Sequence, residues 1–267
     1  MLAMAGAALV AASAQAGPSP TYSADDLLLN FRNPANITGT DLEVNLGPVS
    51  QLTSGVVASS SLVQGVFGSI GSSDTVGLSA DAADASATTG QLWMTRSLSS
   101  LDLSSGPTVP NSGYSSPAQA AFSTQNPIAV KIGNIGTGYN GGTPVTGFAN
   151  AATVPGATAG NSYQAQAEQS SSITGNINFA AESLAASKGG TIETIQNGSG
   201  NVYEALWDIP VTGTAPSYEG YFTFQTDGEV DFTAAPSAVP EPATYGMFAG
   251  IGLAAVALRR QIRSLIA

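Results

Sequence analysis

The sequence predicts a mainly β protein: a β-sandwich or jelly-roll-like body with one or two packed helices, followed by a single C-terminal transmembrane helix. Three observations predict this arrangement. Many short segments alternate apolar and polar residues, as strands with one wet face do. Asn-Gly and Asp-Gly pairs stand between such segments, where hairpin turns need them. One uncharged apolar run lies close to the C-terminus.

The first sixteen residues, Met1–Ala16, are small and apolar and end in Ala14-Gln15-Ala16. An apolar stretch with an Ala-x-Ala end is typical of a secretory signal peptide, so we expect Sec-type export and cleavage after Ala16. The stretch lacks a basic start, which indicates either an atypical signal or a true start codon upstream of Met1. A buried N-terminal helix is the alternative. The chain then divides into a signal peptide (1–16), an exported β-rich domain (17–235) and a sorting segment (236–267).

Strands dominate the first half of the exported domain. Asp25–Arg32 and Leu42–Leu46 read as strands, and the Asn-Pro and Thr-Gly-Thr breaks between them predict a hairpin. Leu62–Phe67 has the length of one or two helical turns. Val76–Ala87 predicts a strand with a loose tail, and Gln91–Leu98 predicts a central strand.

The region that follows predicts loops and then a helix. Ile128–Gly160 is rich in Gly, Asn, Thr and Pro, so we expect long loops with short strands such as Ala129–Ile132. Ser162–Ala186 is the best candidate for a helix outside the membrane, with a break near Thr174-Gly175.

Two hairpins are predicted to close the domain. Thr191–Gln196 and Asn201–Ile209 flank the turn Asn197-Gly198-Ser199-Gly200. Gly220–Ala234 turns at Thr226-Asp227-Gly228, with two apolar side chains of each arm facing inward: Phe222, Phe224, Val230 and Phe232.

The aromatic side chains of the loops and strands offer candidate ligand contacts. We expect Trp93 in the core, because Trp buries a large apolar area, and an exposed sugar-stacking platform is the alternative. Tyr139 and Phe148 are expected to anchor their loops by packing, with ligand contact as the alternative.

The acidic residues offer candidate cation or catalytic sites. Asp74, Asp81 and Asp84 lack the spacing of an EF-hand loop, so we expect solvated acids there. Glu229 and Asp231 share the outer face of the last hairpin, and we expect solvated acids again. Cation binding and acid-pair glycan hydrolysis are the alternatives, and hydrolysis would need two carboxyl groups that flank a cleft.

The composition excludes several function classes. The chain has no cysteine and no histidine, which excludes disulfides, Ser-His-Asp and Cys-His catalysis and imidazole-ligated metals. Between Gly17 and Pro240 there are 4 basic and 17 acidic residues, a net charge near −13. Such a charge disfavours nucleic acid and anionic membrane surfaces as partners. We expect no cofactor and no metal site.

The C-terminal segment has three parts in a fixed order. Val239-Pro240-Glu241-Pro242 should be extended, because proline removes backbone donors and restricts the residue before it. The uncharged run Ala243–Leu258 would span roughly 24 Å as a helix, which is short for a membrane core of about 30 Å. Basic residues follow at once, so the positive-inside rule places the C-terminus in the cytoplasm and the body outside. These membrane-stop residues are Arg259, Arg260 and Arg263.

Val239–Arg260 resembles the PEP-CTERM sorting signal of Gram-negative bacteria, with Pro240-Glu241-Pro242 at the namesake motif. The resemblance implies export, recognition by an exosortase-type membrane transpeptidase and cleavage near the motif. It also implies an inner-membrane intermediate that ends at the cell surface or in the extracellular matrix. Bacteria with this signal tend to form exopolysaccharide or biofilm.

For the exported domain, the leading hypothesis is a surface or matrix protein without catalytic activity. A carbohydrate-binding module associated with exopolysaccharide is the first alternative. A carboxylate-based glycan hydrolase is the second. No residue pattern names an activity.

Overall fold

The structure is a computed structural model that describes residues 21–34, 36, 39–71, 75–84, 91–98, 122–156, 160–168, 192–210 and 216–235. By its internal contacts the chain divides into residues 1–235 and 236–267, and every described residue belongs to the first unit. We call the described part of that unit the body. None of the helices in the body has the length and apolar character needed to cross a membrane. The predicted membrane helix, Ala243–Leu258, lies outside the described residues.

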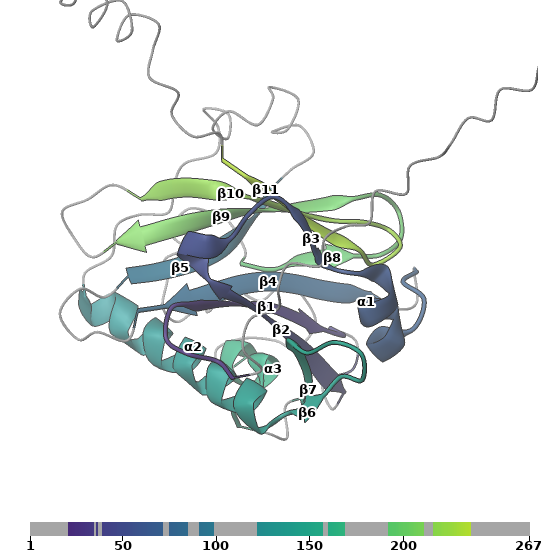
Figure 1. The fold of residues 1–267 in the computed structure, drawn as a ribbon, viewed down its shortest axis with the longest axis horizontal. Coiled ribbons are helices and arrows are strands. Elements are labelled where there is room, and N and C mark those ends of the chain that lie inside the picture. The colour runs from purple at the N-terminus through teal and green to yellow at the C-terminus, as the bar shows by residue number, and fades with distance from the viewer. Residues whose placement is uncertain are drawn as a thin grey trace, which may run out of the picture. The chain divides into compact units, whose positions relative to one another are not determined.

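In the described residues, eleven strands form one sheet whose neighbouring strands all run antiparallel (Figure 1). The order is β3-β11-β10-β9-β5-β4-β1-β2-β7-β6, and β8 pairs with β4 off this path. The strands are β1 (Asp26–Arg32), β2 (Thr40–Pro48), β3 (Gly55–Ala58), β4 (Val76–Ala83), β5 (Gln91–Leu98), β6 (Thr143–Pro144), β7 (Ala151–Pro155), β8 (Thr194–Gln196), β9 (Val202–Pro210), β10 (Ser217–Phe224) and β11 (Val230–Ala234). The helices are α1 (Ser60–Phe67), α2 (Phe122–Gly141), α3 (Tyr163–Glu168) and the short 3-10 helix η1 (Val49–Gln51).

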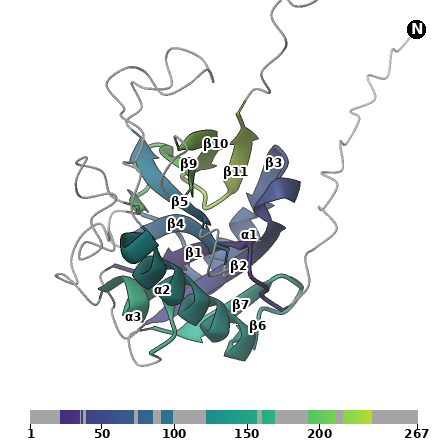
Figure 2. The same cartoon turned by 90° about the vertical axis from the view of Figure 1, so that its left-hand side faces the viewer.

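The two faces of the sheet carry separate cores, because side chains alternate along each strand. On β1, Leu27, Leu29 and Phe31 join the larger core on what we call the inner face, where α1 also packs. Leu28 joins a second core on the outer face, which α2 and α3 cover (Figure 2). Both faces of the central strands are therefore buried.

The sheet curls so that distant strands meet across the inner face. Phe31 on β1 and Phe224 on β10 make an edge-to-face ring contact with centroids 5.7 Å apart, although three strands separate β1 from β10 in the sheet. The mainly β class is confirmed, but the predicted two-sheet sandwich is wrong, since one continuous ladder joins all the described strands. Twist and curl bury the inner face of a single sheet and give the same alternating pattern that a sandwich would.

Helix α2 replaces part of the predicted loop region, so the expectation of a short strand at Ala129–Ile132 is wrong. Four buried side chains follow one another at intervals of four, three and four residues on its packed face: Ile128, Ile132, Ile135 and Tyr139. The glycines that suggested a loop instead permit close packing. A β-carbon at Gly136 would overlap the ring of Tyr22, and one at Gly138 would overlap the carbonyl oxygen of Asn161.

The other predicted elements have mixed outcomes. The β1–β2 hairpin, the α1 turns, β4, β5 and the β10–β11 hairpin are confirmed. The predicted pairing of β8 with β9 is wrong: β9 pairs with β5 and β10, so β8 pairs with the half of β4 that β5 leaves open. Of the helix predicted at Ser162–Ala186, α3 forms the start, and residues 169–186 lie outside the described part.

Candidate functional site

The predicted sorting and processing residues lie outside the body. None of the following is described by the structure: Ala14, Ala16, Val239, Pro240, Glu241, Pro242, Arg259, Arg260 and Arg263. Their roles therefore stay predictions at this point. The body ends at β11, where the backbone N–H of Ala235 donates to the carbonyl oxygen of Glu219 at 2.8 Å.

A layer of polar side chains lies on the outer face of β1, β2 and β4 and includes Glu193, which precedes β8. Helices α2 and α3 pack over this face of the sheet (Figure 2). We call these side chains the buried polar layer, because no member is more than 6% exposed. Strand register orders it into rows across the sheet, such as Glu43, Asn30 and Ser79 on β2, β1 and β4. Its members are Asp26, Asn30, Arg32, Asp41, Glu43, Asn45, Ser79, Asp81 and Glu193.

A buried ion pair fixes one end of this layer. Arg32 donates from Nε to Glu193 Oε1 and from its second guanidinium nitrogen to Glu193 Oε2, both at 2.8 Å. This two-pronged geometry is the strongest form of an Arg–carboxylate pair. The Glu193 carboxylate lies over Gly77, where any β-carbon would overlap it. The glycine on β4 therefore makes room for the ion pair.

Carboxyl groups of β2 hold the start of α3. The backbone N–H of Tyr163 donates to Glu43 Oε1 at 3.1 Å, and that of Gln164 donates to Asp41 Oδ2 at 2.8 Å. The first N–H groups of a helix lack partners within the helix, so these two acids satisfy them. The same helix is held further by Asn134 of α2, whose amide donates to Gln166 Oε1 at 3.2 Å.

Asparagine side chains donate hydrogen bonds to the two remaining acids of the layer. Asn30 Nδ2 donates to Asp81 Oδ2 at 2.8 Å, and Asn45 Nδ2 donates to Asp26 Oδ2 at 2.9 Å. Burial raises the pKa of Asp81 to about 8, and the hydrogen bond from Asn30 opposes that rise. Burial and the neighbouring Asp41 carboxylate raise the pKa of Glu43 well above its ordinary value.

The expectation that Asp81 is a solvated acid is wrong. It is 1% exposed and lies beneath the helical cover, because β4 has a core on each face. Asp84 is half-buried just beyond β4, and Asp74 lies outside the described residues. Among the residues that the structure describes, no three acidic side chains are grouped as a metal site requires.

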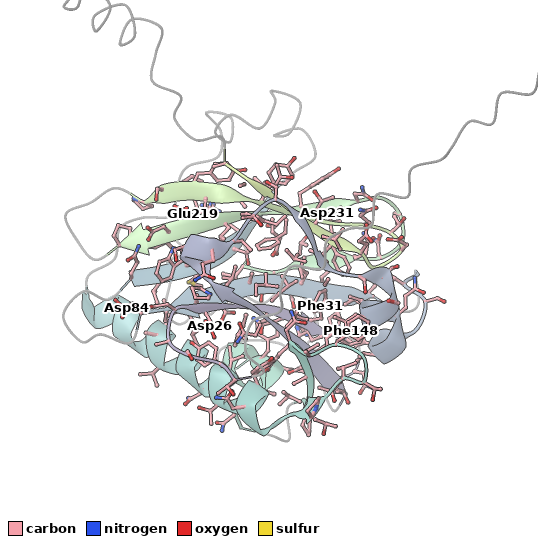
Figure 3. All side chains as sticks on the ribbon, viewed as in Figure 1. Asp26, Phe31, Asp84, Phe148, Glu219 and Asp231 are labelled. Atoms are coloured by element: carbon pink, nitrogen blue, oxygen red, sulfur yellow. The ribbon has the colours of Figure 1, made fainter. Side chains whose placement is uncertain are left out.

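The second group of acids lies on the last hairpin, as predicted. Gln225 Nε2 donates to Glu229 Oε1 at 3.3 Å and to Asp231 Oδ2 at 2.6 Å, and both acids are partly exposed. Burial, followed by the Asp231 carboxylate, raises the pKa of Glu229. This group and the buried polar layer lie in different parts of the sheet, as Asp231 on β11 and Asp26 on β1 show in Figure 3.

All three aromatic side chains that the sequence analysis singled out pack against a core. Tyr139 is buried in the outer core, Phe148 packs against the inner core, and Trp93 is half-buried there, so packing is confirmed as their role. A tyrosine pair that the sequence did not single out lies on β9 and β10. Tyr203 and Tyr221 are half-exposed and meet edge to face, with centroids 6.4 Å apart.

Comparison with known proteins bears on the C-terminal segment. Residues 238–261 match the family model of the PEP-CTERM protein-sorting motif. No curated protein and no solved structure matches the chain. The chain thus carries a PEP-CTERM sorting motif at its C-terminal end, which implies an exported protein that an exosortase sorts to the cell surface.

Proposed function

We propose that the chain is a surface or matrix protein of a Gram-negative bacterium whose exported domain has no catalytic activity. In this proposal a signal peptide ending at Ala16 directs export, and the apolar run before Arg259 holds an inner-membrane intermediate. An exosortase-type transpeptidase then cuts near Pro240-Glu241-Pro242. The observation that carries the proposal is the match of residues 238–261 to the sorting motif.

The placement of acidic groups in the body supports a role other than catalysis. A glycan hydrolase needs two carboxyl groups about 5–9.5 Å apart on either side of a cleft. Asp81 and Glu43 are instead sealed beneath α2 and α3, and Glu229 and Asp231 are neighbours on one face of a hairpin.

The sorting role is tested by changing the motif. A full chain with Pro240→Ala and Pro242→Ala is expected to accumulate in the inner membrane of an exosortase-bearing host, while the unchanged chain reaches the surface fraction. Immunoblots of the fractions measure the split, and we expect surface protein to fall at least tenfold. A Pro236→Ala change is the matched control, because it alters a proline outside the motif. Equal surface amounts for all three chains would contradict the proposal.

Carbohydrate binding is the second candidate, and the pair Tyr203 and Tyr221 favours it. Two half-exposed rings on neighbouring strands offer apolar area with a hydroxyl at each edge, a composition suited to sugar rings. The full chain in neutral detergent would be applied to a glycan array. Tyr203→Ala with Tyr221→Ala is expected to weaken any binding at least tenfold, whereas Val130→Ala, an exposed change on α2, leaves it intact. An array with no bound glycan would remove this candidate.

A further inference from the structure

The buried polar layer contains more acid than its cations can balance. Five of its members are acids that are no more than 6% exposed: Asp26, Asp41, Glu43, Asp81 and Glu193. Arg32 is engaged by Glu193, and among the described residues the other buried cation on this face is Arg96 of β5. A carboxylate removed from water is costly unless it is paired or neutralised by a proton. Burial therefore favours the protonated, neutral form of some acids of the layer.

Asp81 and Asn30 share one hydrogen bond, and each keeps one buried oxygen that is not hydrogen-bonded by any described residue. Asn30 Nδ2 donates to Asp81 Oδ2 at 2.8 Å. In the described part of the chain, the two other oxygens, Asn30 Oδ1 and Asp81 Oδ1, are buried and have no hydrogen-bond partner. Two acceptors cannot bond to each other, but a proton on Asp81 Oδ1 makes that atom a donor toward Asn30. A protonated acid and a carboxamide then satisfy both groups.

Glu43 has a similar surplus oxygen directly below α3. Its Oε1 accepts the N–H of Tyr163, while Oε2 is buried and, within the described residues, has no partner. The hydroxyls of Ser79 and Tyr163 are also buried in this region, and these two side chains hydrogen-bond to each other. A proton on Glu43 Oε2 would supply a donor in a region that holds several acceptors.

We infer that Asp81 and Glu43 carry protons in the folded protein and that these protons hold the α2–α3 cover on the sheet, so that the cover opens when the two acids ionise. The strands below are fixed by ladder hydrogen bonds on both sides of β1 and β4, so the helices above are the part that can move. Water reaches the ionised groups only if the cover lifts. The inference does not depend on the sorting role.

Several elements bring charged or titratable groups near the two acids; the acidic groups among them oppose ionisation, and the arginines favour it. The charged and titratable groups that face them are Tyr22 and Asp25 before β1, Asp26 and Arg32 of β1, Asp41 of β2, Glu193 before β8, Arg96 of β5, Tyr139 of α2 and Tyr163 of α3. Burial raises the pKa of Tyr139 to about 12 and that of Tyr163 well above its ordinary value, so both phenols stay neutral between pH 5 and pH 8.

The direction of the pH effect follows from linkage. The pKa of Asp81 rises from an ordinary value of 3.8 to about 8 on folding. Its contribution to stability is therefore complete below about pH 4 and is lost as pH rises toward 8. Each retained proton makes the unfolding equilibrium constant grow about tenfold per pH unit across that window. Burial also raises the pKa of Glu204 on the inner face, which adds to the slope of the unchanged protein.

The test compares the pH slope of unfolding in three full-length chains held in neutral detergent. Urea titrations at several values from pH 5 to pH 8 give the free energy of unfolding at each pH. This free energy should fall steeply with rising pH for the unchanged chain. For Asp81→Asn the number of protons released on unfolding, which sets the slope, should be smaller by about one. Asp231→Asn makes the same chemical change on the last hairpin and should keep the original slope. Equal slopes for all three chains, or stability that rises with pH, would overturn the inference.

A local measurement separates a moving cover from general loosening. After correction for the intrinsic pH effect, amide hydrogen exchange should quicken at least tenfold in α3 above pH 8, while Phe222 and Phe224 in β10 stay protected. This readout needs no variant, so it holds even if Asp81→Asn fails to fold, and Glu43→Gln serves as the second variant. If the exchange rates in α3 and in β10 change by the same factor at every pH, the inference that the two protons hold the cover is overturned.

Discussion

Replacing Arg32 with methionine is expected to lower the free energy of unfolding by about 3–5 kcal/mol, because the change leaves the Glu193 carboxylate buried without its cation. For a body of this size the loss corresponds to a fall in Tm of roughly 10 °C. Urea unfolding of the full chain in neutral detergent at pH 7 measures it.

The paired variant Arg32→Met with Glu193→Leu distinguishes the ion pair from simple packing. Apolar residues of similar volume often replace a buried ion pair at little cost, so the double change should recover most of the lost stability. If the double variant is less stable than Arg32→Met by the full cost of a second core change, the buried pair is not the source of the first loss.

Replacing Phe31 with alanine is expected to cost about 3–5 kcal/mol, since a fully buried ring on the inner face leaves a cavity. The ring also meets Phe224 across the curl of the sheet (Figure 3 labels Phe31 on β1). Urea unfolding of the full chain measures the loss, and Val56→Ala on the exposed side of edge strand β3 should cost about 0.5 kcal/mol or less.

The curl predicts coupling between two strands that are not neighbours. The costs of Phe31→Ala and Phe224→Ala should differ from additive by at least about 0.5 kcal/mol in a double-mutant cycle, because the rings are in contact. Strict additivity would show that β1 and β10 do not meet across the inner face in solution.

The sequence predicted elements whose signal is local. The β10–β11 hairpin carries alternating apolar residues and an Asp-Gly turn, and Gly228 has the positive φ of 91° that such a turn requires. The sorting segment could also be predicted from the sequence, because its proline motif, apolar run and arginines are contiguous. The pairing of β8 with β4 could not be predicted from the sequence, since it depends on which strand edges already pair with other strands.

Helix α2 was missed because its composition resembles a loop. Glycines at 133, 136 and 138 lower helix propensity, and tertiary packing overrides that preference. The useful signal was the spacing of Ile128, Ile132, Ile135 and Tyr139, which places the four side chains on one helical face.

The buried polar layer was missed because alternating polar residues on β2 resemble a solvent-facing strand. Asp41 and Glu43 are buried where α3 packs on β2, and one strand's pattern cannot report that cover. The sequence of β1 held a clue, since Leu28 and Leu29 are adjacent and therefore point to opposite faces. A strand that is apolar on both faces buries Asn30 as well.

The most direct test of the sorting account is the intact mass of the protein released at the surface of its own host. The account predicts a chain that begins at Gly17, lacks Ala243–Ala267 and ends near Pro240-Glu241-Pro242, with any added group attached there. Recovery of the unprocessed chain from the cytosol, with residues 1–16 and 243–267 still in place, would contradict it.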